Sequence, residues 1–220
     1  MKFKKILFIL SVFFLGCQNT NNQPDVETNR GNDTVINDTV IKDNKHNSEN
    51  SLESTDQSQA ILALTSNALQ VVNIPSGSTS EIAVGMEMNK VLEIVSRVLK
   101  LEIPEAQVNS ECGAGPMTMM VFKNGLVLMF QKAKGNPGDM EFVGWSESDN
   151  GVGKKLTTMA GIGIGSTRAE LESAYNVKIT KTSLGMEFTT IPDGLYGIID
   201  GPSETSMINF MWSGLSCNFR

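Results

Sequence analysis

The chain offers few residues with the type and spacing that catalysis requires. Its single histidine, His46, lies in a polar stretch before the apolar part of the sequence, so neither a Ser-His nor a Cys-His pair is available in that part. Acidic residues are scattered between positions 102 and 204, and their spacing singles out no carboxylate pair. No zinc or calcium-loop motif occurs. The sequence therefore predicts no catalytic residue, no metal ligand and no cofactor.

A glycine-rich stretch, GIGIGST at 161–167, could instead cradle a phosphate group. Its third glycine comes one residue too early for a dinucleotide fingerprint, and the lysine of a P-loop is missing. The similar stretch IAVGMEM at 82–88 shares only one of these glycines. We therefore interpret Gly165 as the turn into a helix, with Thr167 as its N-cap and Glu170 completing a capping box. Phosphate binding at that helix start stays the alternative.

The N-terminus has the pattern of an exported protein. Three lysines precede an apolar run from Ile6 to Leu15, which is too short to span a bilayer but fits the central region of a signal peptide. The run ends in Phe14-Leu15-Gly16-Cys17, which resembles the lipobox of bacterial lipoproteins. The resemblance implies a signal peptide over residues 1–16, lipidation of Cys17, and a lipid-anchored protein of the cell envelope, in the outer membrane and facing the periplasm or the cell surface. An ordinary secretory signal stays the alternative.

Composition divides the rest of the chain. Removal of the leader leaves 15 basic and 24 acidic residues, because residues 1–16 contain three of the 18 basic residues and no acidic one. Such an acidic chain is a poor partner for nucleic acid. Residues 17–57 contain no Phe, Trp or Tyr, which predicts a lipid anchor followed by a disordered tether. From residue 58 the sequence is apolar with regular glycines, and we expect two folded units, 58–150 and 151–220.

Two cysteines lie beyond the anchor, Cys112 and Cys217. In an exported protein an even pair indicates a disulfide bridge. Free thiols or a metal-binding pair are the alternative. The chain also has 12 methionines, which we interpret as core filling or as a pliable contact surface, with Cu(I) binding as the alternative.

An internal repeat organises the folded region. The region is predicted to begin with a helix near Asp56–Val72, where apolar residues recur at three- and four-residue spacing. Two similar patterns follow, at 82–99 and 162–177. Each has an apolar pair, a glycine that turns the chain (Gly85 or Gly165), and then helical spacing.

Each pattern is followed by the signals of a hairpin and a further strand. Asn124-Gly125 and Asp193-Gly194 each lie between apolar runs, which predicts type I′ hairpin turns. A third strand is expected at 142–146 in the first unit and at 210–213 in the second.

Trp145 and Trp212 occupy equivalent positions in these third strands, which indicates core packing for both rings. Each unit is then expected to contain a strand, a turn, a helix, a hairpin and a strand. The predicted fold class is α+β, with two helix-on-antiparallel-sheet units in tandem, preceded by one N-terminal helix.

The stretch Gly-Ser-Thr-Arg-Ala-Glu-Leu at 165–171 resembles the helix start of BamE/SmpA-type lipoproteins and of the tandem-repeat β-lactamase-inhibitor-protein fold. The resemblance implies a threonine-capped helix that packs on an antiparallel sheet, and a role in protein–protein contacts. The first unit departs from this pattern. Glu87 stands in the place of Thr167 and Lys90 in the place of Glu170, so its capping box is missing.

The sequence favours a membrane-anchored envelope lipoprotein with a non-enzymatic, protein-binding or structural role. The expected partner is an envelope protein, and the lipid on Cys17 is the expected contact with the membrane. A small-ligand or glycan-binding module on a lipid tether is the alternative, and a hydrolase built on carboxylates is a further one.

Overall fold

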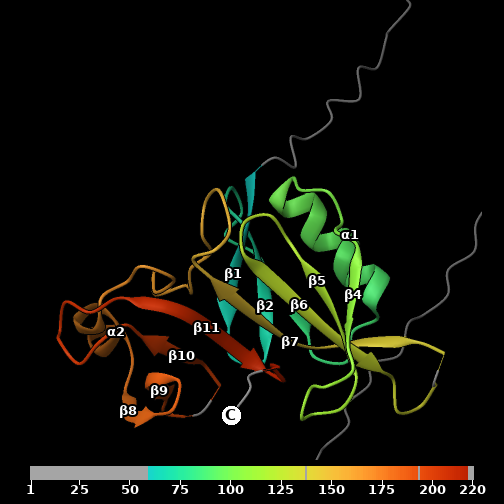
Figure 1. The fold of residues 1–220 in the computed structure, drawn as a ribbon. Helices are drawn as coiled ribbons and strands as arrows, with labels where there is room; N and C mark the ends of the chain where they lie inside the picture. Colours follow the sequence, from blue (N-terminus) through green and yellow to red (C-terminus); the bar gives the residue numbers. More distant parts are fainter. Residues whose placement is uncertain (1–58, 137, 193, 218–220) are drawn as a thin grey trace, which may run out of the picture. The chain divides into compact units, whose positions relative to one another are not determined.

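The computed structural model describes residues 59–136, 138–192 and 194–217, in two antiparallel sheets with two helices (Figure 1). The smaller sheet has the strand order β1-β2-β3, and the larger has the order β4-β5-β6-β7-β11-β10-β9-β8. The elements are β1 (Ala60–Thr65), β2 (Ala68–Asn73), β3 (Thr79–Ala83), α1 (Met88–Leu99), β4 (Ala106–Asn109), β5 (Met117–Val121), β6 (Leu126–Lys132), β7 (Met140–Ser148), α2 (Arg168–Ala174), β8 (Val177–Thr182), β9 (Gly185–Thr190), β10 (Tyr196–Ile199) and β11 (Ile208–Gly214).

The predicted α+β fold class was wrong, because strands far outweigh helices in the described residues. The two helices have only 12 and 7 residues, whereas most buried side chains lie in strands. What does recur is the order of elements, since α1 is followed by β4 to β7 and α2 by β8 to β11. The last strands of the two sets, β7 and β11, pair with each other, so both sets form one sheet.

The predicted N-terminal helix was also wrong, because most of its described residues, 59–72, belong to the β1–β2 hairpin. Ser66 and Asn67 make the turn, and Asn67 has a φ of 65°, which asparagine tolerates better than most residues. Leu62, Leu64 and Leu69 are all buried in the main core. When most residues of a run are apolar, helical spacing is satisfied along with strand spacing, so periodicity cannot separate the two.

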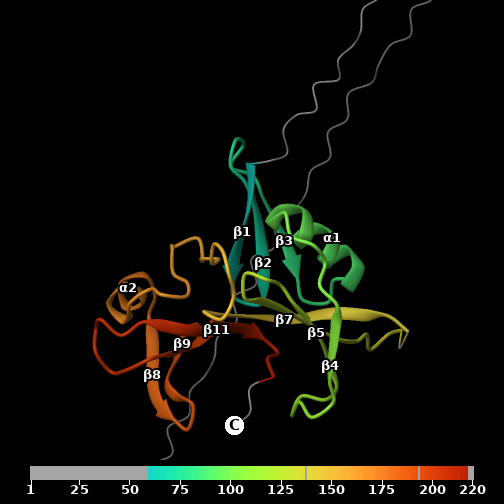
Figure 2. The ribbon, with the colours of Figure 1, turned by 45° about the horizontal axis from the view of Figure 1, so that its top comes forward.

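The main core lies between the larger sheet, the smaller sheet and the helices. Figure 2 shows β1, β2, β3 and α1 on one side of the central strands β7 and β11. α1 buries Val91, Leu92 and Val95 in this core, and α2 buries Leu171 in it. The outer strands β4 and β8 extend to the other side of the sheet (Figure 2). In the described part of the chain, neither a helix nor a second sheet covers that other face.

The two tryptophans lie on opposite faces of the larger sheet. Trp145 pairs with Ser213 and Trp212 pairs with Ser146, and successive residues of a strand point to opposite faces. Trp145 is fully buried, and its Nε1 donates to a carbonyl oxygen of β2 at 2.9 Å. The prediction of core packing is therefore confirmed for Trp145, whereas Trp212 faces away from the main core. A bulge at Val143, which the pairing with β6 skips, shifts the alternation of β7.

Candidate functional site

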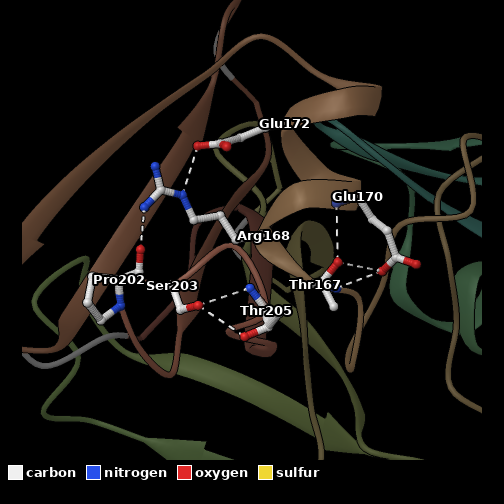
Figure 3. A network of polar contacts seen from close by, with 7 residues as sticks. All are labelled: Thr167, Arg168, Glu170, Glu172, Pro202, Ser203 and Thr205. Atoms are coloured by element: carbon white, nitrogen blue, oxygen red, sulfur yellow. Dashed lines mark hydrogen bonds and ion pairs between the residues drawn. The ribbon is translucent and has the colours of Figure 1, made fainter.

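The start of α2 has the cap that its sequence indicates (Figure 3). Gly165 has a φ of 88° and turns the chain before the helix. Thr167 Oγ1 accepts a hydrogen bond from the Glu170 backbone N–H at 3.2 Å, and the Thr167 N–H donates to Glu170 Oε2 at 2.7 Å. The bonds from the backbone and the side chain of Thr167 lower the pKa of the Glu170 carboxyl.

The other N–H groups at the start of α2 are also occupied, which argues against the phosphate alternative. The N–H groups of Arg168 and Ala169 donate to carbonyl oxygens of the loop 201–206, at 2.8 and 3.0 Å. The Arg168 guanidinium bonds the Glu172 carboxylate at 2.8 Å and the Pro202 carbonyl oxygen at 2.7 Å (Figure 3). These contacts hold the loop against the helix start, and an anion would have to displace them.

α1 begins with a different cap. The Glu87 carboxylate accepts hydrogen bonds from the backbone N–H groups of Asn89 and Lys90, at 2.8 and 3.0 Å. These bonds lower the pKa of the Glu87 carboxyl. Gly85 precedes this cap with a φ of 92°. A single side chain, that of Glu87, thus caps α1, whereas two side chains, those of Thr167 and Glu170, cap α2.

The two predicted turns lie between β5 and β6 and between β9 and β10. In the first, the Gly125 N–H donates to the Phe122 carbonyl oxygen at 3.0 Å, so Asn124 lies inside the turn and Gly125, with a φ of 98°, ends it. The predicted type I′ geometry was wrong here, because Asn124 does not have the positive φ that this turn needs. In the second, Asp193 lies outside the described residues, and Gly194 has a φ of 149°. A Cβ atom on Gly194 would lie 2.2 Å from the Cβ atom of Ser66. The second turn therefore packs against the turn of the β1–β2 hairpin, at a distance that only glycine permits.

Cys112 and Cys217 lie next to each other as two thiols. Burial raises the pKa of Cys217 to about 11, and the hydrogen bond and the charge interaction with Cys112 add to this effect. The structure brings the predicted pair together, and the bridge between the two sulfurs stays a prediction. Cys17, the predicted lipidation site, lies outside the described residues.

The face of the larger sheet that points away from the main core has a row of side chains across seven strands. In register from β5 to β8, the row consists of Val121, Val127, Ser146, Trp212, Tyr196, Thr189 and Lys178. The next row consists of Ser148, Phe210, Ile198, Glu187 and Thr180. Charged residues enter these rows only on β8 and β9. We use the name open face for Val127, Trp212, Tyr196, Phe210 and Ile198.

Three aromatic rings gather at the centre of the open face. The Tyr196 and Trp212 rings stack with their centroids 5.8 Å apart and an interplanar angle of 18°. The Phe210 ring lies 5.5 Å from the Trp212 ring. Trp212 is only 4% exposed, whereas Tyr196 and Phe210 are partly exposed. Since Tyr196 and Trp212 are also directly paired in the β10–β11 ladder, the backbone fixes the cluster in place.

Sequence reasoning missed the open face, although a signal for it was present. Tyr196 and Ile198 are two residues apart, as are Phe210 and Trp212, and this spacing places each pair on one face of a strand. The comparison of the two units instead assigned Trp212 to the core by analogy with Trp145.

Three cavities lie away from the open face. One of about 480 Å³ lies beside the start of α2 and is lined by Glu170 among small residues, and one of about 410 Å³ lies between the smaller sheet and α1, near Arg97 and Lys100. A third of about 280 Å³ lies between β1, the end of α1 and the segment 152–157. None of these three brings two carboxylates together. The described residues contain no cluster of three His, Cys, Asp or Glu side chains suited to a metal ion, and neither described helix has the length and apolarity of a membrane span.

No family model matches the chain, and no curated protein and no solved structure matches it either.

Proposed function

We propose that the chain is a lipid-anchored envelope protein with a non-enzymatic role, and that it binds an envelope protein through its open face. The observation that supports this proposal most is the cluster of Tyr196, Phe210 and Trp212, whose two rows of side chains contain charged residues only on β8 and β9.

The composition of the open face is typical of the core of a protein interface. Such cores are rich in tyrosine, tryptophan, phenylalanine and methionine, and poor in lysine, glutamate and aspartate. Most of the binding energy of an interface comes from a few packed aromatic or arginine side chains near its centre. Tyr196 and Phe210 are exposed enough to contact a partner, and the buried Trp212 ring supports both of them. A partner would therefore meet a rigid aromatic surface, which lowers the entropic cost of binding.

Replacing Tyr196 and Phe210 together by serine is expected to weaken capture of the partner by roughly 30-fold, which corresponds to about 2 kcal/mol for loss of an interface hot spot. The measurement is a pull-down from detergent-solubilised envelope with the tagged full chain, quantified for each protein recovered. Val108→Ser is the matched control. Val108 is 72% exposed on β4, and its pairing with Thr118 places it on the opposite face of the sheet.

Only a partner that the control retains and the double variant loses supports the proposal. Recovery of no stoichiometric partner, or of the same partner by both variants, contradicts it. A saccharide or another small ligand whose binding depends on Tyr196 and Phe210 would instead favour the ligand-binding alternative.

Cys17→Ser is expected to release the chain from membranes, because several acyl chains on one cysteine hold a protein stably on a bilayer. The measurement is the share of the chain in the membrane fraction, together with incorporation of a labelled fatty acid. Cys217→Ser is the control, since it removes a thiol outside the lipobox-like motif and should leave membrane binding unchanged. An unaltered membrane fraction for the Cys17 variant would refute the lipid anchor.

A further inference from the structure

A second, smaller core lies on the same side of the larger sheet as the open face, and it is unusually rich in sulfur. Of its seven side chains, five contain sulfur, and the other two are valines. In the main core only six of 35 side chains contain sulfur. The sulfur-containing members are Cys112, Met117, Met119, Met129 and Cys217.

Several segments of the chain meet to form this cluster. Cys112 lies in the loop between β4 and β5, Met117 begins β5, and Met129 lies in β6. Cys217 follows β11, where the Leu215 N–H donates to the Val143 carbonyl oxygen at 2.9 Å and holds the segment against β7. Cys112, Met117 and Met129 are buried. The cluster is therefore assembled by the fold and not by neighbours in sequence.

Polar contacts within the cluster involve the two thiols. Cys112 and Cys217 are both free thiols and pack in this one cluster. The Asn109 side-chain amide donates to Cys217 Sγ at 3.2 Å. An N–H donor aimed at sulfur stabilises negative charge on it, as hydrogen-bond donors to the ligands of a metal ion do.

We propose that Cys112 and Cys217, together with the thioethers of Met117 and Met129, form a binding site for Cu(I). Thiolate and thioether sulfurs are the soft ligands that select Cu(I) over the hard cations that prefer oxygen. On binding, each thiol loses its proton to solvent and forms a sulfur–copper bond, and the metal keeps its oxidation state. Because the protons must be displaced, the affinity should rise with pH.

The same two thiols are the pair predicted to form a disulfide bridge. A single molecule can have either the bridge or bound Cu(I), but not both. A bridge forms when an oxidant removes two electrons and both protons from the pair. Bound Cu(I) occupies both sulfurs and should slow that reaction. Packing alone would not require sulfur, since leucine fills a core as well as methionine does.

The test is an anaerobic titration of the reduced full chain with Cu(I), in detergent and in competition with a coloured Cu(I) chelator. The chain carries Cys17→Ser, so that Cys112 and Cys217 are its only thiols. We expect one tightly bound Cu(I) per chain, a thiolate-to-copper absorption band in the ultraviolet, and release of two protons. Cys217→Ser should abolish these signals. Asn109→Ala should weaken binding by about tenfold, because it removes the hydrogen bond to the Cys217 sulfur.

Paired methionine variants separate a metal site from a packed core. Met117→Leu with Met129→Leu removes two thioethers from the cluster, and Met120→Leu with Met211→Leu removes two buried thioethers from the main core. The Met117/Met129 double variant should bind Cu(I) at least about tenfold more weakly than the parent chain. The Met120/Met211 double variant should bind it as tightly as the parent chain does. The proposal is overturned if the chelator retains all the Cu(I), if fewer than two protons are released, or if the two pairs bind equally tightly. The parent chain must release two protons, so a smaller number overturns the proposal even if a variant does not fold.

Discussion

Replacement of Trp145 by alanine is expected to lower the free energy of unfolding by about 4 kcal/mol, within the range known for buried tryptophan. Trp145 is fully buried in the main core. Its Nε1–H is shared between the carbonyl oxygens of Thr65, at 3.1 Å, and Ala68, at 2.9 Å. These two residues close the β1–β2 hairpin. The indole therefore holds the smaller sheet against β7 both by packing and by hydrogen bonding.

Trp145→Phe is the matched variant, because it keeps an aromatic ring and removes the N–H donor. We expect it to lose about 1–3 kcal/mol, the usual cost of a buried acceptor left without its partner. The measurement is urea denaturation of the three proteins, with a thermal scan in which the alanine variant should melt roughly 10 °C lower. If alanine costs no more than phenylalanine, packing of the ring is not what holds the smaller sheet in place.

The ends of several elements could be predicted from the sequence because neighbouring residues determine them. Thr167 and Glu170 bond each other's backbone across a single helical turn, and glycine at position 125 supplies the positive φ of a tight turn. Pairing of β7 with β11 has no such local signal. It joins two strands that are far apart in the sequence, so the comparison of the two units could give their element order but not the single sheet that they share.

One error at the N-terminus explains why the open face was not predicted. The stretch 56–72 was assigned to a helix, whereas its residues from Ala60 onward form part of the sheet that covers one face of β6, β7 and β11. Without that sheet, strand alternation showed which residues share a face but not which of the two faces is covered. Trp145 and Trp212 then looked equivalent, although one lies under the smaller sheet and the other on the open face. The cysteine pair could be predicted from the number of cysteines alone. The methionines beside it could not, because only the fold brings them together.

The unfolding free energy of the parent chain is expected to fall by about 3 kcal/mol as the pH rises from 4.5 to 8, because Glu147 is buried. Glu147→Gln is expected to abolish this fall. Glu147 is fully buried on β7, opposite Leu126 of β6 and Met211 of β11. Its Oε1 accepts a hydrogen bond from the Leu156 N–H at 2.8 Å. Its Oε2 has no hydrogen-bond partner among the described residues. The carboxyl thus loses its hydration and gains a single donor in return.

Burial is the main cause of the pKa shift of this carboxyl. It raises the pKa of Glu147 from 4.5 to about 7, and the Leu156 N–H and the charge of Lys155 oppose the shift. Lys155 does not form an ion pair with Glu147 in this structure, because its Nζ donates to three backbone carbonyl oxygens, those of Asn124, Ser148 and Gly151. Between pH 4.5 and 7 the folded chain therefore binds more protons than the unfolded chain, and stability falls as the pH rises.

Glutamine keeps the acceptor for the Leu156 N–H and has no charge at any pH. The difference in unfolding free energy between Glu147→Gln and the parent chain should therefore grow by about 3 kcal/mol from pH 4.5 to pH 8, measured by urea denaturation at a series of pH values. Glu170→Gln is a control of opposite sign. The pKa of Glu170 is lowered, so its contribution is lost as the pH falls and not as it rises. Parallel pH profiles for Glu147→Gln and the parent chain would mean that burial does not hold the proton on Glu147.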